Sequence, residues 1–359
     1  MVPPTEVRGH PQKNYPDSVE AFPNPFSPCL VAKRTSPRRE KFQEMIGKLD
    51  PDDLAMVVSR TGARDDDVQV GPGYGEDAAE IRVGDQSLVV SSDPLSLARE
   101  RLGTLAVNVA CNDVAASGAD PRWLTNVVFL SDDDPETLDV VTQQIDDSAR
   151  ELGVAIVGGH SEYAPDLSRP MVTMTAMGLT DAFVPTGGAE PGDRLILTKG
   201  AGIEGTAILA TDFRDEVGEN ANRGESFFEE ISVVEDARIL REDATAMHDP
   251  TEGGVVTGLL EMAEASGVCL EVAREDVPVR DVTRELCDTM GVDPLRIFGS
   301  GALLAAVPED AVSAVLSDLY EAGISADEIG RVVDGDGELV VDEEVVSEPP
   351  RDDLYHLWE

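Results

Sequence analysis

The segment Met247-His-Asp-Pro-Thr-Glu-Gly-Gly-Val255 leads into a helical pattern. The apolar residues that follow at helical spacing are Val255, Leu259, Met262 and Ala263. Asp249 or Thr251 could therefore be a simple helix cap. The same geometry also makes an anion site, because the free N–H groups and the positive dipole end of a helix point at whatever precedes it. Both interpretations, a cap and a phosphate-binding loop, stay open at this point.

Two common nucleotide-binding patterns are missing from the sequence. It holds no G-x-x-x-x-G-K-[ST] segment, and Gly71-Pro-Gly73-Tyr-Gly75 does not fit G-x-G-x-x-G. Neither a P-loop fold nor a Rossmann fold accounts for these glycine-rich loops.

Three acidic residues occupy comparable places in the first half of the chain. Asp77 lies in a glycine-rich loop, Asp93 ends an apolar run, and Asp113 lies within an otherwise apolar or small-residue helix. A charge inside such a helix is costly unless it is paired or bound to a metal. Mg²⁺ would supply that partner, because it favours one or a few carboxylates together with substrate phosphate oxygens. Each Asp alone is best explained as a turn or cap residue, but the three together indicate a metal and phosphate site.

A further cluster is Val157-Gly-Gly-His-Ser-Glu162, where we expect an apolar strand to break into two glycines. Such glycines let a backbone approach a ligand closely. His160 and Glu162 should then lie on one side of the extended chain. A lone His is more often structural, so this pattern is a weak signal by itself.

Short apolar runs alternate with helical periods along the chain, which predicts a mixed α/β fold. The predicted strands are 88–91, 126–130, 154–157, 171–177, 195–198 and 303–307, and the predicted helices are 52–61, 102–117, 135–152, 254–266, 282–290 and 309–322. A loop-like segment at 184–193 precedes a new strand and marks a domain boundary. We expect domains at 45–186 and 187–345 and a tail at 346–359, each domain being near the usual size.

The chain is strongly acidic, with 71 acidic and 28 basic residues among its 359 and a formal charge of -43. That charge would repel nucleic acids and anionic membranes, so neither is an expected partner. Apolar runs such as 154–157 indicate a folded protein with acidic residues on its surface rather than a disordered acidic chain. The lysines are Lys13, Lys33, Lys41, Lys48 and Lys199. Arginine therefore carries most of the positive charge, a usage that resembles proteins of extreme halophiles; an ordinary acidic protein is the alternative.

Several features point to a cytoplasmic protein. Cys29, Cys111, Cys269 and Cys287 are scattered without a zinc-ligand spacing, so we expect reduced, mostly buried thiols. The sequence has no apolar run long enough to span a membrane and no hydrophobic signal core.

Residues 1–44 differ from the rest of the chain. They are rich in proline and carry a basic patch between Lys33 and Lys41. Either a flexible arm precedes the domain or translation starts at Met45. The onset of regular patterning near Met45 favours the second interpretation.

Six motifs in order resemble those of the AIR-synthase-like superfamily, over about residues 45–341. They are Gly75-Glu-Asp-Ala-Ala79, Ser91-Ser-Asp-Pro94, Asn112-Asp-Val-Ala-Ala-Ser-Gly-Ala119, Gly158-Gly-His-Ser-Glu162, Pro191-Gly-Asp-Arg194 and Asp249-Pro-Thr-Glu-Gly-Gly254. The superfamily includes AIR synthetase, FGAM synthetase, thiamine-monophosphate kinase, selenophosphate synthetase and the maturation factor HypE. The segment 247–254 is most similar to the HypE branch.

The resemblance implies a PurM-like fold of two α/β domains, in which strands of the first domain pair with a second copy to form a homodimer. It implies ATP and Mg²⁺ as cofactors, with Asp77, Asp93 and Asp113 as metal ligands. It also implies a catalytic set of His160, Glu162 and Asp249. The implied nucleotide-binding residues are Gly73, Gly75, Asn112, Gly158, Gly159, Thr251, Gly253 and Gly254.

The implied activity is the ATP- and Mg²⁺-dependent phosphorylation of an amide, carbonyl or phosphate oxygen in an unidentified acceptor. HypE proper carries its substrate on a C-terminal Cys, whereas in this sequence Cys287 is the last cysteine. Synthesis of a cyanide ligand on the chain itself is therefore not expected. Two alternatives remain: a phosphotransferase like thiamine-monophosphate kinase, which usually has Gly-Gly-Asp where this chain has His160, and a non-catalytic nucleotide-binding scaffold.

Transfer from multimolar KCl to dilute buffer should lower the melting temperature. Multimolar salt shortens the Debye length to about 3 Å or less, so repulsion within a chain of charge -43 grows when salt is removed. Calorimetry in the two buffers measures this change. Equal melting temperatures would rule out the halophile interpretation.

Overall fold

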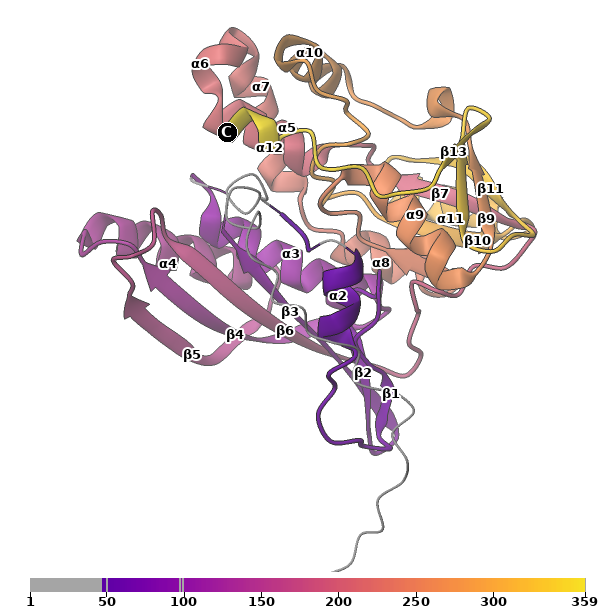
Figure 1. Cartoon of the computed structure of the whole chain (residues 1–359), viewed down its shortest axis with the longest axis horizontal. Coiled ribbons are helices and arrows are strands. Elements are labelled where there is room, and N and C mark those ends of the chain that lie inside the picture. The colour runs from indigo at the N-terminus through magenta and orange to yellow at the C-terminus, as the bar shows by residue number, and fades with distance from the viewer. Residues whose placement is uncertain (1–46, 50, 97, 99, 359) are drawn as a thin grey trace, which may run out of the picture. The chain divides into compact units, whose positions relative to one another are not determined.

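The computed structural model describes residues 47–49, 51–96, 98 and 100–358. The expected arm at 1–44, the alternative start at Met45 and Cys29 lie outside the described residues. Residues 47 onward belong to one compact unit, and the described part contains two sheets with their helices (Figure 1). The prediction of an α/β fold is confirmed.

The first sheet has six strands in the order β1-β2-β3-β6-β4-β5. Their bounds are β1 Val68–Val70, β2 Ala79–Val83, β3 Gln86–Leu95, β4 Asp120–Leu130, β5 Ala155–Tyr163 and β6 Met171–Thr180. Neighbours are antiparallel except for β4 and β5, which are parallel. A short helix, α2 (Pro51–Val58), precedes this sheet.

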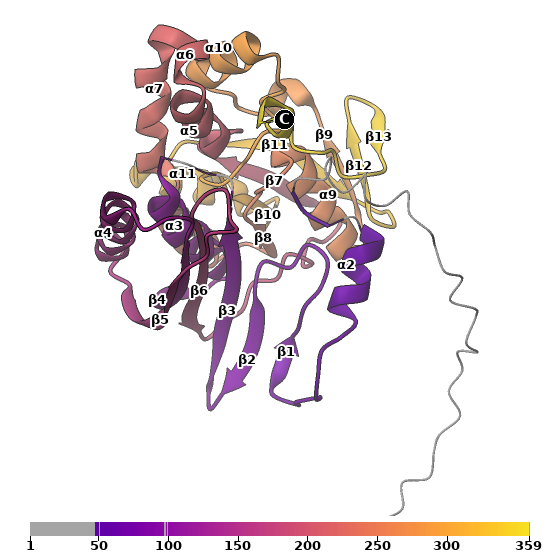
Figure 2. The same cartoon turned by 60° about the vertical axis from the view of Figure 1, so that its left-hand side comes forward.

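Helices α3 (Leu102–Ala116) and α4 (Pro135–Glu151) lie together on one face of the first sheet (Figures 1 and 2). Buried and partly exposed residues alternate along β6, because successive side chains of a strand point to opposite faces. Val172, Met174 and Ala176 point to the core with α3. Nearly every residue of α3 is buried, including Asn112 and Asp113.

The second sheet has seven strands in the order β13-β12-β9-β11-β7-β10-β8. Their bounds are β7 Asp193–Thr198, β8 Ala246–His248, β9 Cys269–Val272, β10 Leu304–Pro308, β11 Ala326–Val333, β12 Glu338–Val341 and β13 Glu344–Val346. The α-helices of this half are α5 Ile203–Asp212, α6 Arg214–Val217, α7 Ala221–Glu225, α8 Val234–Leu240, α9 Gly254–Ser266, α10 Asp281–Met290, α11 Val312–Glu321 and α12 Tyr355–Trp358.

One hydrophobic core joins the two sheets. Apolar residues of α3 belong to the same buried cluster as Ile196 of β7 and Ala305 and Val307 of β10. A second cluster packs α9 against the other face of the second sheet, through residues such as Leu195 and Leu259. Helix α3, which carries Asp113, contacts β8, and Asp249 directly follows β8, so the two predicted chemical segments come close together.

The structure corrects one predicted strand. We expected a strand at 154–157 that breaks at Gly158, but β5 continues from Ala155 to Tyr163. It does so because its backbone pairs with β4 through the glycines and on to Leu130. The segment 203–240, to which the sequence assigned no element, holds four short α-helices.

The described cysteines carry no disulfide. Cys111 and Cys287 are buried and Cys269 is partly exposed, and burial raises the pKa of Cys111 to about 12. Among the described residues, no helix has the length and apolar character needed to cross a membrane.

Gly103→Ala should destabilise the protein, because α3 and α4 approach closely at this position. A Cβ on Gly103 would lie 2.5 Å from the carbonyl oxygen of Val141 and 2.7 Å from Cβ of Gln144. Such overpacking costs about 1–3 kcal/mol, more than the gain of up to about 1 kcal/mol in helix propensity. Urea denaturation measures the change. The control is Gly71→Ala, whose Cβ would meet only Val68 at 3.8 Å; equal stabilities of the two variants would contradict the close packing.

Candidate active site

Asp93 and Asp113 are brought together by Ser91. Asp93 lies on β3, and Asp113 is buried on α3 beneath it. Ser91 Oγ is 3.1 Å from Asp93 Oδ2 and 2.7 Å from Asp113 Oδ2. A hydroxyl has one proton to donate, so it serves one carboxylate at a time. Burial, and then the nearby carboxylates of Asp93, Asp77 and Asp249, raise the pKa of Asp113 well above its ordinary value.

Asp77 belongs to a chain of buried charges that also includes His248 and Glu261. His248 Nδ1 forms an ion pair with Asp77 Oδ1 at 2.8 Å, and His248 Nε2 lies 3.0 Å from Glu261 Oε2. Lys48 Nζ continues the chain at 3.2 Å from Glu261 Oε1. The other oxygen of Asp77, Oδ2, accepts a hydrogen bond of 3.2 Å from the backbone N–H of Asp249. These contacts fix the Asp77 carboxylate between β8 and α9.

The charges along this chain favour an imidazolium at His248. Burial alone would lower the pKa of His248, but Asp77 and Glu261 outweigh it and raise that pKa to about 10. Burial would likewise raise the pKa of Glu261, but Lys48 and His248 lower it to about 2. The protonated ring and the Lys48 ammonium thus compensate the two carboxylates at neutral pH, as buried charges require.

Asp249 is one of several buried groups whose hydrogen bonding is incomplete among the described residues. It follows β8, is 1% exposed, and neither of its carboxylate oxygens has a hydrogen-bond partner among the described residues. Burial, and then Asp77, raise its pKa well above the ordinary value, while the charge on His248 opposes this. Buried polar groups are nearly always satisfied, so Asp249 indicates a partner outside the chain.

This donor set fits Mg²⁺ bound together with a phosphate. Among the described residues, no three His, Cys, Asp or Glu side chains are grouped so that they could hold a metal alone. Mg²⁺ keeps its own waters and takes one or two carboxylates plus substrate oxygens. The oxygens of Asp77, Asp93, Asp113 and Asp249 suit such a shared site.

The glycines before α9 are required by the backbone. Gly253 has φ +77 and Gly254 has φ +64, and a Cβ on Gly253 would lie 2.2 Å from Thr257 Oγ1. The carbonyl of Thr251 accepts the N–H groups of Gly254 and Gly299 and so fixes the turn. The N–H of Gly253 donates to a carboxylate of the chain itself, Asp352 Oδ2, at 2.8 Å.

Two predicted nucleotide-binding residues have structural roles. Asn112 donates to the carbonyl of Ile231 and accepts from the N–H of Val233, both at 2.9 Å. Its amide therefore holds the 231–233 loop, and nucleotide binding by Asn112 stays a prediction. Gly75 packs against α9, where a Cβ would lie 3.1 Å from Cβ of Glu261. A Cβ on Gly73, in the same loop, would contact only the side chain of Glu76.

The structure does not bring His160 and Glu162 to the aspartates within one chain. Across the sheet, Asp93 is opposite Met174, Met174 is opposite Asn126, and Asn126 is opposite Gly159. Three strand spacings, about 14 Å, therefore separate β5 from Asp93. His160 and Glu162 do lie on one side of β5, 3.2 Å apart and exposed. Gly158 and Gly159 are also exposed on this edge strand.

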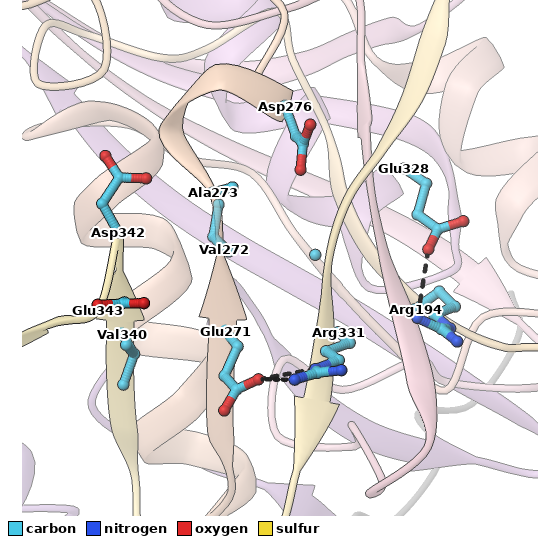
Figure 3. Close-up of a pocket in the computed structure, with 11 residues that line it drawn as sticks. Arg194, Glu271, Val272, Ala273, Asp276, Glu328, Arg331, Val340, Asp342 and Glu343 are labelled. Carbon is cyan, nitrogen blue, oxygen red and sulfur yellow. Dashed lines mark hydrogen bonds and ion pairs between the residues drawn. The ribbon is translucent and has the colours of Figure 1, made fainter.

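A pocket of about 570 Å³ opens elsewhere, on the second sheet (Figure 3). Two arginines cross it, and both are already paired: Arg331 with Glu271, and Arg194 with Glu328 and Glu309. The other charged residues that line it are Asp276, Asp342 and Glu343. Its net negative lining disfavours a nucleotide phosphate, so the candidate site remains at the aspartates.

The sequence alone did not single out His248, Glu261 or Lys48 as site residues. A signal for Glu261 was present, since it is an acidic residue in a largely apolar helix, and the structure buries it to 4% exposure. His248 lies within the 247–255 segment, but the sequence does not show which charged residues pair with it. Its partners come from residues 77 and 261, and only the folded chain brings them together.

Comparison with known proteins identifies the family. Residues 75–180 match the N-terminal domain of AIR synthase related protein, and residues 190–342 match the C-terminal domain. The carbamoyl dehydratase HypE of Azotobacter vinelandii is 30% identical over 271 residues, which cover 72% of this chain and 78% of that protein. The chain belongs to the AIR synthase-related family.

Solved structures agree with that assignment. A hydrogenase maturation protein HypE in complex with ATP has a TM-score of 0.62 at 27% identity, covering 74% of this chain and 86% of that one. AaThiL complexed with AMPPCP and TMP has a TM-score of 0.69, covering 85% and 98%. Its identity is 20%, so this second likeness shows the fold alone.

His248→Gln should destabilise the protein by about 3 kcal/mol or more, because it leaves buried carboxylates without their cation. A folded pKa of about 10 against an ordinary 6.5 means that this stabilisation is full below pH 6.5 and is lost as the pH rises through 10. The gap in melting temperature between wild type and variant should therefore be wide near pH 6 and narrow near pH 10.

The matched control is His356→Gln, since His356 is exposed on α12. Its melting temperature should follow that of the wild type at every pH. A His248→Gln gap of constant width would show that the ring is neutral in the folded protein.

Proposed function

We propose that this protein uses ATP and Mg²⁺ to phosphorylate an amide, carbonyl or phosphate oxygen of a separate acceptor. The observation that carries the proposal is the convergence of four aspartates around Ser91 and the start of α9, with Asp249 left unpartnered. Such a cluster is unfavourable without a cation. The HypE structure with bound ATP supports ATP as the ligand.

In the proposed reaction, Asp77, Asp93 and Asp113 would be the carboxylates of the metal site, one or two of them binding Mg²⁺ directly and the rest acting through its waters, and they would orient the phosphates. The metal would neutralise charge on the transferring phosphoryl group. Thr251, Gly253 and Gly254 form the turn proposed to take the phosphates, and the N–H of Gly253 is its proposed donor, since that of Gly254 bonds the Thr251 carbonyl. Asp249, with its free oxygens and raised pKa, is the proposed general base that takes a proton from the acceptor.

We also propose that the protein is a homodimer joined along β5. All nine residues of this edge strand are exposed, including the apolar Ile156, Val157 and Tyr163. A long exposed edge strand with apolar side chains is otherwise a liability. A dimer would cover it and place His160 and Glu162 at the interface, where they could still contribute to a site. We retain 45–186 and 187–345 as the proposed domains and the cytoplasm as the proposed compartment.

The acceptor is proposed to be another molecule. Burial raises the pKa of both Cys111 and Cys287 to about 12. Burial and nearby glutamates also raise that of Cys269. Thiols with raised pKa values are poor nucleophiles, so the described cysteines do not suit a carrier role.

Two other functions remain as alternatives. A kinase like thiamine-monophosphate kinase is supported by the fold, but His160 stands where that group usually has Asp. A non-catalytic scaffold would bind nucleotide without turnover. The incompletely bonded Asp249 disfavours it, because a scaffold gains nothing from that cost.

Asp93→Asn and Asp113→Asn should each lower ATP turnover about 100-fold or more, because each removes a charge that serves metal and phosphate. The free energy of unfolding should change little. Phosphate release in multimolar KCl measures turnover, with candidate acceptors added. The control, Asp85→Asn in the exposed turn between β2 and β3, should keep wild-type activity. Normal turnover with low stability in both site variants would assign the aspartates a structural role.

A further inference from the structure

The C-terminal strap, residues 347–358, leaves β13 and returns to the helices around α5 and α6 (Figure 1). Its far end is anchored in the core, since Leu354 and Tyr355 are 0% and 2% exposed. The ring of Trp358 lies 5.7 Å from that of Phe213, and the ring of Tyr355 meets that of Phe298 edge-on at 5.7 Å. Aromatic pairs of this kind hold a chain end firmly.

Between these anchors and β13, the strap covers the turn before α9. Asp352 Oδ2 accepts the N–H of Gly253 at 2.8 Å, and the carbonyl of Pro350 accepts from Thr257 Oγ1 at 3.4 Å. A Cβ on Gly253 would lie 2.8 Å from that same Pro350 carbonyl. The strap backbone therefore rests on the glycine turn that we propose as the phosphate-binding loop.

The position of Asp352 is electrostatically unfavourable. Its side chain is buried, and burial raises its pKa to about 8 despite the hydrogen bonds from Leu354 and Gly253. The nearby carboxylates of Glu252 and Glu204 also raise it. Glu204 is itself buried, and its pKa is raised to about 7. The carboxylate of Asp352 is thus desolvated and lies near other carboxylates that repel it. The anchors of the strap hold it in this position.

A helix cap is the simpler explanation, since carboxylates often bind the N–H groups that begin a helix. Two observations favour more than a cap. Asp352 is 99 residues from Gly253 in the sequence, so it does not belong to the local turn. The same turn also contains Asp249, which is buried without a hydrogen-bond partner and so calls for an external ligand.

We propose that the C-terminal strap is a self-blocking lid, in which Asp352 occupies the N–H of Gly253 that a ligand phosphate would take. This inference rests on the proposed function. The part from 347 to 353 must lift for the phosphate to bind, while the aromatic anchors keep the strap attached. Phosphate displaces Asp352 because it arrives with a divalent cation, which offsets the surrounding carboxylates, whereas Asp352 brings no positive charge.

The test compares two acidic residues of the strap. Asp352→Ala removes the blocking carboxylate. Glu348→Ala is the matched control, because it removes an exposed carboxylate from the same strap. Calorimetric titration with the Mg²⁺ complex of a non-hydrolysable ATP analogue measures the dissociation constant. Asp352→Ala should bind about threefold to tenfold more tightly than wild type, the equivalent of one lost competing hydrogen bond. Glu348→Ala should match the wild type.

Hydrogen exchange of the wild-type protein supplies a second measurement. Addition of the analogue should speed exchange of the amides at 347–353 and slow that of the first turn of α9. Equal affinity in all three proteins, or slower strap exchange with ligand, would overturn the lid and leave the proposed function standing. No binding by any of the three would overturn both.

Discussion

The buried contact of His248 with Asp77 and Glu261 is the interaction on which the rest of the site depends. It joins the loop before β2 to the end of β8 and to the middle of α9, three segments far apart in the chain. A charged ring between two carboxylates is directional as well as attractive, so it fixes where Asp77 points. The backbone N–H of Asp249 completes this arrangement by binding the second oxygen of Asp77. Without this contact, the acidic residues would repel each other across the join between the two sheets.

The helix α3 provides the other half of that join. It is buried almost completely, between the first sheet and residues of the second. A carboxylate such as Asp113 is costly in this position unless it binds a partner. Ser91 alone cannot satisfy Asp93 and Asp113 at once. The free protein therefore holds an excess of negative charge in a place where its packing is otherwise complete. This is the expected state of a site that completes its electrostatics with a bound cation and phosphate.

Much of this arrangement could be predicted from the sequence, and the limits are physical. The α/β class and the helices α3 and α9 followed from periodicity, whereas the grouping of Asp77, Asp93, Asp113 and Asp249 followed from the family resemblance that the ordered motifs carry. His160 and Glu162 were grouped with them because nothing in one sequence reveals strand order, and two strands lie between. The structural role of Asn112 was not predicted, because its bonds run to backbone groups at 231 and 233, which carry no side-chain signal. The partners of His248 could likewise not be predicted, because they lie far from it in the sequence.

The scarcity of lysine has a consequence for how this protein can be studied. The described part of the chain contains Lys48 and Lys199, and each contacts a buried carboxylate: Glu261 for the first and Asp236 for the second. The side chain of Lys199 is only 10% exposed, whereas that of Lys48 is 48% exposed. An amine-reactive reagent therefore finds few targets on this part of the surface. Its reaction at Lys48 would report chemically on whether the charge chain through Glu261 is intact, which makes this residue a native probe of the site.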